Sequence, residues 1–415
     1  MVVVLALLRQ LCQFWVKVYG NNAFQKTLWI SSLLYITKSI IQRYIRHSQT
    51  KLYYQHNSIN NRVVKNFRTI HNYYPSPFLN NGWLQTIWAG LMEEMNPSKT
   101  KYKREIVEML DGGIVAIDWS PNSDHLKDDA PTIVVLHGVT GHSNAPYIES
   151  LYQVAVHRGY RLAVFIARGC GNLDLRSPRL FGAADTDDCR FVVQKVAQRY
   201  PHSPLYGVGF SLGSNVLTKY VGEEGSHCPL VGFVSLCNPY NFCRIFENLG
   251  FKGKVVQKML AVSIIKMMSR HTSELKKIEH YYGIDFVNKV FKANSLLSID
   301  DEFTCKMRGF KGALAYYQTA NSSDHIKHIE IPGLFISTKD DIVCLLKGLP
   351  MEEIRAKENL MLCLTHGGGH LGFFEGLTAS KQWHPEVIMD YFEGLELCRK
   401  ERLSFREEIS YDDDD

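Results

Sequence analysis

Short apolar runs alternate with helix-like stretches through most of the chain after residue 100. The runs are continuously apolar, which is typical of strands covered on both faces, and they fall at residues 132–138, 160–166, 205–210, 230–236, 333–339 and 359–365. Helical patterns lie between and after them, at residues 145–158, 188–199, 212–222 and 384–400. Strands that alternate with helices predict an α/β fold with a mostly parallel sheet and helices on both faces.

Two segments depart from this alternation. The turn sequence Asp111-Gly112-Gly113 separates "REIVEML" from "GIVAIDW" and predicts an antiparallel hairpin. Residues 240–325 are mostly helical in pattern and rich in Lys, Met and aromatic side chains. A helical insertion so late in the sheet is expected to lie over the carboxyl ends of the strands, where open α/β sheets bind ligands.

The first part of the chain has an unusual charge distribution. Residues 1–92 contain ten Lys and Arg and no Asp or Glu, so the formal net charge of +5 belongs to this segment and the body is mildly acidic. The apolar runs "MVVVLALL" and "LWISSLLYI" lie here, beside Trp15, Trp29 and Tyr35. Apolar side chains with aromatic and basic neighbours suit a bilayer interface. We therefore predict a membrane-associating segment over residues 1–50.

The topology of that segment stays open between a single span and a monotopic attachment. A span needs roughly 20 apolar residues, and Arg9, Lys17, Lys26 and Lys38 divide the region into shorter pieces. The endoplasmic reticulum or the plasma membrane is the favoured location. A mitochondrial presequence is the alternative, which the aromatic content weakens.

The rest of the chain divides by composition. Residues 51–100, rich in Asn, Tyr and Pro, are predicted to be a linker or wrapping segment, residues 101–400 the globular domain, and residues 401–415 a polar acidic tail. The ten cysteines show no Cys-x-x-Cys pair and no zinc spacing, so we expect free thiols, no metal and no organic cofactor. The net charge gives no indication of a nucleic-acid partner, and the oligomeric state is not determined.

The sequence Gly209-Phe210-Ser211-Leu212-Gly213 joins a predicted strand to a predicted helix. This is the setting of a nucleophile elbow, a sharp turn that exposes a serine hydroxyl. The alternative is an ordinary turn that contains a serine. Because a serine hydroxyl is a weak nucleophile, the first interpretation also requires a histidine base and a carboxylate that orients it.

Both partners occur where a hydrolase needs them. Asp340 and Asp341 follow the strand at 333–339, and His366 and His370 follow the strand at 359–365. The chain order Ser, Asp, His is that of the α/β hydrolases. Since the carboxyl ends of parallel strands meet at one edge, one residue of each pair is expected beside the serine.

An oxyanion hole would complete the site. "HGVTG", His137 to Gly141, ends the strand at 132–138. We predict that the backbone N–H groups of Val139 and Leu212 are the donors, and that His137 steadies this loop rather than reacting.

Six motifs together resemble one family: "NGWLQT", "LHGVTG", "ARGCG", "GFSLGSN", "TKDD" and "HGGGHLGFFEG" are similar to those of the membrane-associated α/β-hydrolase-domain lipases, over about residues 75–395. The resemblance implies an α/β-hydrolase fold with a helical lid at about 240–325. It also implies Ser211 as nucleophile, Asp341 as acid and His370 as base. Trp83 and Ser214 depart from the family pattern, which more often has histidine and glycine there.

The resemblance implies a serine hydrolase that cleaves acyl esters of membrane lipids through an acyl-enzyme, as an acylglycerol lipase or a phospholipase. Its expected partners are a lipid ester and a membrane surface. Transfer of the acyl group to an alcohol is one alternative, and a non-catalytic receptor or scaffold with a hydrolase fold is another. Neither the acyl-chain length nor the headgroup follows from the sequence.

Overall fold

A computed structural model describes residues 50–401, apart from residues 72, 96, 99 and 247–249, together with scattered positions between residues 10 and 41. The chain divides into two compact units, Met1–His47 and Ser48–Asp415. Most of the predicted membrane-associating segment, and all of the predicted acidic tail except Glu401, lie outside the described residues. Within the described positions, no helix combines the length and the apolar character that a bilayer crossing requires.

The described residues form a nine-stranded sheet in the order β1-β9-β8-β7-β6-β4-β5-β3-β2, with a separate two-stranded ribbon of β10 and β11. The strands are β1 (Thr50–Tyr53), β2 (Lys103–Glu108), β3 (Ile114–Trp119), β4 (Thr132–Leu136), β5 (Arg161–Ile166), β6 (Leu205–Phe210), β7 (Gly232–Leu236), β8 (Gly333–Thr338), β9 (Leu360–Thr365), β10 (Phe374–Glu375) and β11 (Lys381–Gln382). Strands β4 to β9 are mutually parallel. The predicted α/β fold with a mostly parallel sheet is confirmed.

Antiparallel strands close both ends of the sheet. The predicted hairpin is β2 and β3, in which Glu108 pairs with Ile114, and β3 continues antiparallel to β5. At the other end β1 pairs antiparallel with β9. Strand β1 lies at the start of the predicted linker or wrapping segment and adds an edge strand to the main sheet. Local pattern does not reveal so short a strand, because its partner lies near the other end of the chain.

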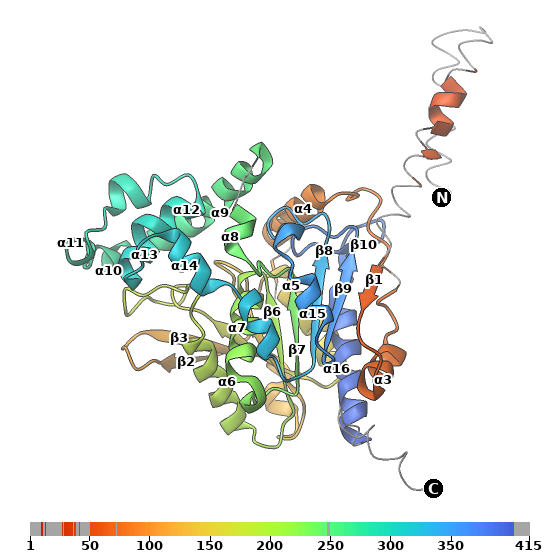
Figure 1. Ribbon diagram of the computed structural model, residues 1–415, viewed down its shortest axis with the longest axis horizontal. Coiled ribbons are helices and arrows are strands. Elements are labelled where there is room, and N and C mark those ends of the chain that lie inside the picture. The colour runs from red at the N-terminus through yellow and green to blue at the C-terminus, as the bar shows by residue number, and fades with distance from the viewer. Residues whose placement is uncertain are drawn as a thin grey trace. The chain divides into compact units, whose positions relative to one another are not determined.

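Helices cover both faces of the sheet (Figure 1). Those of the body are α3 (Ser58–Asn66), α4 (Gly82–Met95), α5 (Pro146–His157), α6 (Asp187–Arg199), α7 (Leu212–Glu224), α15 (Met351–Arg355) and α16 (His384–Lys400). Helices α5 and α3 pack against α16, and α6 packs against α7 on the opposite face. Each helix predicted in the body is present.

The predicted lid, residues 240–325, is helical as expected. Its helices are α8 (Phe242–Phe246), α9 (Phe251–Ser269), α10 (Thr272–Lys276), α11 (Glu279–Tyr282), α12 (Leu296–Ile299), α13 (Cys305–Arg308) and α14 (Ala313–Ala320). Figure 1 shows them beyond the carboxyl ends of the central strands, on the side where α4 also lies. The lid has a core of its own, which includes Met267, Met268, Phe286 and Phe303.

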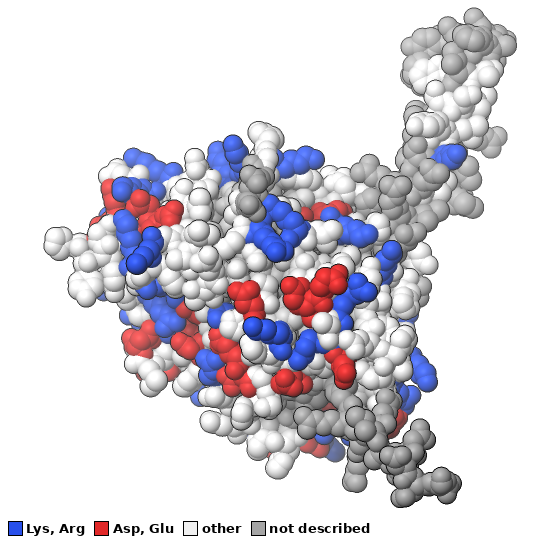
Figure 2. Space-filling model, in the orientation of Figure 1, with Lys and Arg blue, Asp and Glu red and all other residues white. Residues whose placement is uncertain are grey.

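The surface carries both signs of charge. Figure 2 shows basic and acidic side chains interspersed over the face drawn, with basic side chains along its upper rim. Helix α9 departs from this mixture, since its sequence contains four lysines and no acidic residue. The lid therefore presents a positive helix at the end of the sheet where ligands of α/β folds bind.

Candidate active site

Ser211 occupies a strained turn between β6 and α7. Its φ is 53° and its ψ is −118°, a conformation that L-amino acids rarely adopt. Such a residue costs on the order of 1–3 kcal/mol and persists only where its surroundings enforce it. A Cβ at Gly209 would lie 2.5 Å from the Ser214 Cα, and one at Gly213 would lie 2.4 Å from the Leu136 oxygen. Both glycines are therefore needed for the turn. Ser211 occupies the position at the tip of this turn that the nucleophile has in a nucleophile elbow.

Ser214, one of the departures from the family pattern, braces this turn. Its buried hydroxyl lies 2.6 Å from the Gly209 carbonyl oxygen and accepts a hydrogen bond of 3.0 Å from the Leu236 N–H. The Ser211 N–H in turn donates to the Leu236 carbonyl at 3.0 Å. The hydroxyl thus joins the ends of β6 and β7 directly beneath the elbow.

His370 reaches Ser211 from the loop after β9. Its Nε2 lies 2.8 Å from the Ser211 Oγ, and its Nδ1 lies 3.0 Å from the Asp341 Oδ2. A carboxylate can only accept, so Nδ1 carries a proton and donates to Asp341. Nε2 is then free to accept the serine proton. Asp341 and His370 are largely buried, with 2% and 12% of their side chains exposed.

The structure decides between the two aspartates. The Asp341 Oδ1 accepts hydrogen bonds from the N–H groups of Val343 and Cys344, both at 2.8 Å, while its other oxygen faces His370. Asp340 instead accepts from the Gly369 N–H at 2.9 Å. Asp341 therefore orients the imidazole, and Asp340 holds the backbone of the loop that carries it.

The second histidine lies outside this constellation. His366 Nε2 is 3.0 Å from the Lys339 Nζ, in an exposed pair. The structure brings together Ser211, Asp341 and His370 and leaves Asp340 and His366 in supporting positions. The same preference was implied by the family resemblance.

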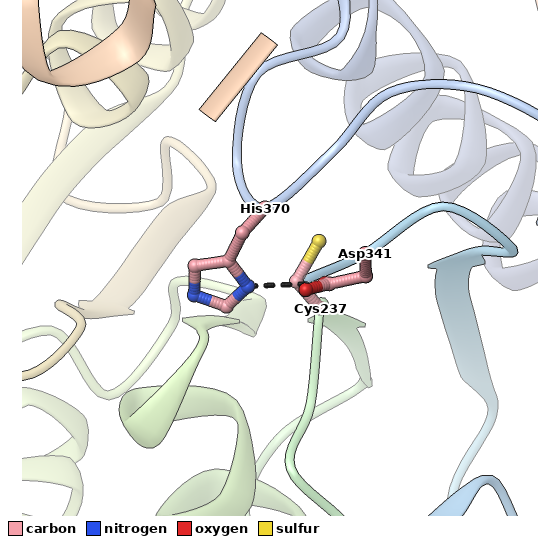
Figure 3. Close-up of side chains that lie close together, drawn as sticks. All are labelled: Cys237, Asp341 and His370. Carbon is pink, nitrogen blue, oxygen red and sulfur yellow. Dashed lines mark hydrogen bonds and ion pairs between the residues drawn. The ribbon is translucent and has the colours of Figure 1, made fainter. Parts of the chain in front are cut away.

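A buried cysteine also flanks Asp341. Figure 3 shows Cys237 beside the Asp341–His370 pair, and the possible ligand atoms of the three residues lie within 4.8 Å of one another. A metal site would need a thiolate and a free histidine nitrogen. Burial and the neighbouring Asp341 charge raise the pKa of the Cys237 thiol well above its usual value. Both nitrogens of His370 have partners, so the cluster does not fit a metal ion.

The predicted oxyanion donors lie beside the nucleophile. Val139 and Leu212 line the same cavity as Ser211. Leu212 is the first residue of α7, where backbone N–H groups have no acceptor within the helix. Buried His137 holds the Val139 loop: its Nε2 accepts from the Ala167 N–H at 3.2 Å and its Nδ1 donates to the Gly138 oxygen at 2.6 Å. Burial lowers the pKa of His137 to about 4, which keeps the ring neutral.

An apolar cavity extends from Ser211 under the lid. The apolar side chains that line it include Phe242, Ile245, Leu260, Ile264, Leu296, Ile299 and Phe303. The lining is interrupted by Asp300, which accepts hydrogen bonds of 2.8 Å from the hydroxyls of Thr304 and Tyr317. Burial raises the pKa of Asp300 to about 6. This cavity, called the apolar cavity below, suits an extended hydrocarbon group.

Two supporting residues were missed by the sequence-based predictions. The Thr86 hydroxyl accepts a hydrogen bond of 2.8 Å from the His370 N–H, and Cys237 contacts Asp341. Thr86 ends "NGWLQT", so the family motif contained it without indicating its role. No pattern in the sequence marks Cys237.

This elbow on a mostly parallel sheet, with a histidine and an aspartate after later strands, defines an α/β hydrolase. A profile of the alpha/beta hydrolase fold matches residues 131–377. The chain belongs to the α/β-hydrolase fold family.

Curated relatives match along most of their length. The embryogenesis-associated protein EMB8 of Picea glauca is 34% identical over 77% of this chain and 72% of its own. The phospholipase ABHD3 of Homo sapiens is 28% identical over 77% of this chain and 78% of its own. The monoacylglycerol lipase ABHD2 of Danio rerio is 28% identical over 90% of this chain and 89% of its own.

Proposed function

We propose that this protein is a serine hydrolase that cleaves acyl esters of lipids, with Ser211, His370 and Asp341 as its catalytic triad. The observation that carries the proposal is the unbroken line of contacts from Ser211 to His370 and on to Asp341, at 2.8 and 3.0 Å. A non-catalytic receptor or scaffold does not require a serine in a strained backbone conformation and in contact with a histidine base. The enzyme is therefore preferred over the non-catalytic alternative.

The mechanism follows from these contacts. His370 Nε2 takes the Ser211 proton as the hydroxyl attacks the ester carbonyl, and Asp341 stabilises the resulting imidazolium. The N–H groups of Val139 and Leu212 donate to the oxyanion. His370 then returns the proton to the departing alcohol. Water, activated by the same imidazole, hydrolyses the acyl-enzyme and releases the fatty acid.

The substrate class is supported by two observations. The apolar cavity begins at Ser211 and can hold an acyl chain, with Met267, Ile264 and Leu260 of α9 on its lid side. Relatives that match along most of their length are named as a phospholipase and as monoacylglycerol lipases. A glycerol-based lipid ester is therefore the proposed substrate.

We propose in addition that residues 1–50 attach the enzyme to a membrane, as their basic and aromatic composition suggests. Flotation of the full chain with liposomes tests this. A chain that starts at Ser48, the beginning of the second compact unit, should remain in the unbound fraction. Equal flotation of both chains would contradict this attachment.

The catalytic proposal is tested with a fluorophosphonate probe, which labels activated serines. The wild-type chain should be labelled and should hydrolyse 1-lauroylglycerol. Ser211→Ala should not be labelled, and its kcat should be lower by a factor of at least about 10³. A thermal melt of the variant controls for folding. A folded wild-type protein that neither reacts with the probe nor cleaves the ester would refute the assignment.

A further inference from the structure

A second cavity lies beside the apolar one and differs from it in chemistry. It has a volume of about 690 Å³ and is lined mainly by polar and charged side chains from β2, α4, the C-terminal part of α9 with the residue after it, and the loops after β4 and β5. Thr140 and Met267 line both cavities, so the two are neighbours. We call it the polar cavity. Nothing in the proposed mechanism uses it so far.

The lining of the polar cavity carries an excess of positive charge. Lys266, Arg270 and Arg104 line it, and its acidic residue is Glu93. Glu93 is already paired with His142, at 2.8 Å. One carboxylate cannot neutralise a lysine and two arginines, so the lining keeps a net positive charge.

The three cations differ in their partners. Arg104 forms a two-point ion pair with Asp118, at 2.7 and 2.8 Å. Arg270 donates to the side-chain oxygen of Asn172 at 2.9 Å, a neutral partner. Among the described residues, no carboxylate lies within ion-pair distance of Lys266 or Arg270. Lys266 lies in the last turn of α9 and Arg270 directly follows the helix, so these two side chains are one helical turn apart on the wall of the polar cavity.

The polar cavity adjoins the place where the ester would react. Thr140 directly follows the proposed oxyanion donor Val139, and its φ of 55° turns the chain sharply at this point. The Thr140 and Ser263 hydroxyls lie 2.9 Å apart, in a hydrogen bond that ties the oxyanion loop to α9. With the acyl chain in the apolar cavity and the carbonyl at Val139 and Leu212, the alcohol part of the ester is directed to the neighbouring polar cavity.

We infer that the polar cavity is the leaving-group subsite, and that Lys266 and Arg270 bind the phosphate of a glycerophospholipid. The inference rests on the proposed function, because it assigns the alcohol half of the ester that Ser211 attacks. The bond that breaks joins the acyl carbonyl to a glycerol oxygen, which receives the proton from His370, and the phosphate ester itself remains intact. A neutral glyceride would offer only hydroxyls to these two cations, whereas a phosphate forms charge-assisted hydrogen bonds with both.

The test compares two substrates with the same acyl chain. The full-length enzyme is assayed on 1-lauroyl-glycerophosphocholine and on 1-lauroylglycerol in neutral detergent micelles. The wild type is expected to prefer the phospholipid, and Lys266→Gln with Arg270→Gln to lower the ratio of the two kcat/KM values at least about tenfold. The matched control is Lys258→Gln, an exposed lysine of the same helix outside both cavities, which should keep the wild-type ratio.

Other outcomes would overturn the inference in distinguishable ways. An unchanged ratio in the double variant, or a wild type that cleaves only the neutral glyceride, refutes the phosphate subsite and leaves the serine hydrolase intact. A folded wild-type protein that cleaves neither substrate and is not labelled by the fluorophosphonate probe refutes the proposed function itself. Competitive inhibition of glyceride cleavage by glycerol 3-phosphate or inorganic phosphate, without any preference for the phospholipid, assigns the site to a free phosphate and refutes the lipid headgroup.

Discussion

The backbone N–H of His370 donates a hydrogen bond of 2.8 Å to the hydroxyl of Thr86 on α4. Next to it, the Gln85 side-chain oxygen accepts from the Phe374 N–H at 2.9 Å. Gly369 fits tightly against the same helix, since a Cβ there would lie 2.4 Å from the Gly82 oxygen. Helix α4, from the segment predicted to be a linker or wrapping segment, thus holds the loop that presents His370, the proposed catalytic base.

Removing this contact should impair catalysis without removing a catalytic group. Thr86→Val keeps the shape of the side chain but loses its hydroxyl, so the His370 loop loses an anchor. We expect kcat to fall about fivefold, since a hydrogen bond contributes roughly 1 kcal/mol. Thr86→Ser, which keeps the hydroxyl, should retain near wild-type kcat. Equal activity of Thr86→Val and the wild type would show that α4 does not position the base.

The neighbouring aspartates should respond very differently to amide substitution. In Asp341→Asn the amide oxygen can keep the hydrogen bonds from Val343 and Cys344, which turns the amide NH₂ group towards His370. A donor at this place disfavours the catalytic tautomer, so kcat should fall by about 10⁴ as in other Ser-His-Asp triads. In Asp340→Asn the amide oxygen can still accept from the Gly369 N–H, so the loss should stay below about tenfold. Steady-state hydrolysis of 1-lauroylglycerol measures both. Comparable losses would contradict the division of roles.

Glycine at the elbow should be irreplaceable for steric reasons. In Gly213→Ala the new Cβ would meet the carbonyl oxygens of Leu136 and His137 at 2.4 and 2.5 Å, and both are backbone atoms. We expect destabilisation above about 3 kcal/mol or failure to fold. The control is Gly90→Ala on α4, which has nothing within 4 Å and should stabilise by about 0.5–1 kcal/mol. Thermal denaturation compares the two. A melting temperature of Gly213→Ala equal to wild type would contradict the packing.

The pH dependence of stability should reflect a buried imidazole. His384 packs between the rings of Phe210 and Phe373, with centroids 5.8 and 5.9 Å away, and burial lowers its pKa from 6.5 to about 3. As pH falls from 6.5 towards 3, the unfolded chain gains a proton at this site that the folded chain does not. The stability contribution is therefore complete above pH 6.5 and is lost on acidification, by about 2 kcal/mol at pH 5.

This pH effect can be isolated with His384→Phe. Between pH 7.5 and pH 5, the melting temperature of the variant should decrease less than that of the wild type. The exposed His227, changed to Gln, serves as control and should follow the wild type. Parallel curves for His384→Phe and the wild type would show that the ring does not titrate in this way.

Much of the candidate site could be predicted because it follows from local pattern. Ser211, Asp341 and His370 each lie in the turn or loop that follows a continuously apolar strand, and parallel strands bring their carboxyl ends to one edge. The two Asp and the two His were harder to separate. Which member of each pair points inward depends on loop conformation, for example on the hydrogen bond that the Gly369 N–H donates to Asp340. The resemblance to the family, and not the local pattern, indicated Asp341 and His370.

The sequence by itself determined the alternation of strands and helices, the elbow and the chain order of the triad, because buried strands and tight turns have strong local signatures. Only the tertiary structure decided that β1 and α4 belong to the hydrolase unit, that Thr86 holds the His370 loop, and that Lys266 and Arg270 line a cavity next to Thr140. Those relationships join residues far apart in the chain. They arise from how the lid and the elements β1 and α4 pack against the rest of the hydrolase unit, and no local pattern contains that packing.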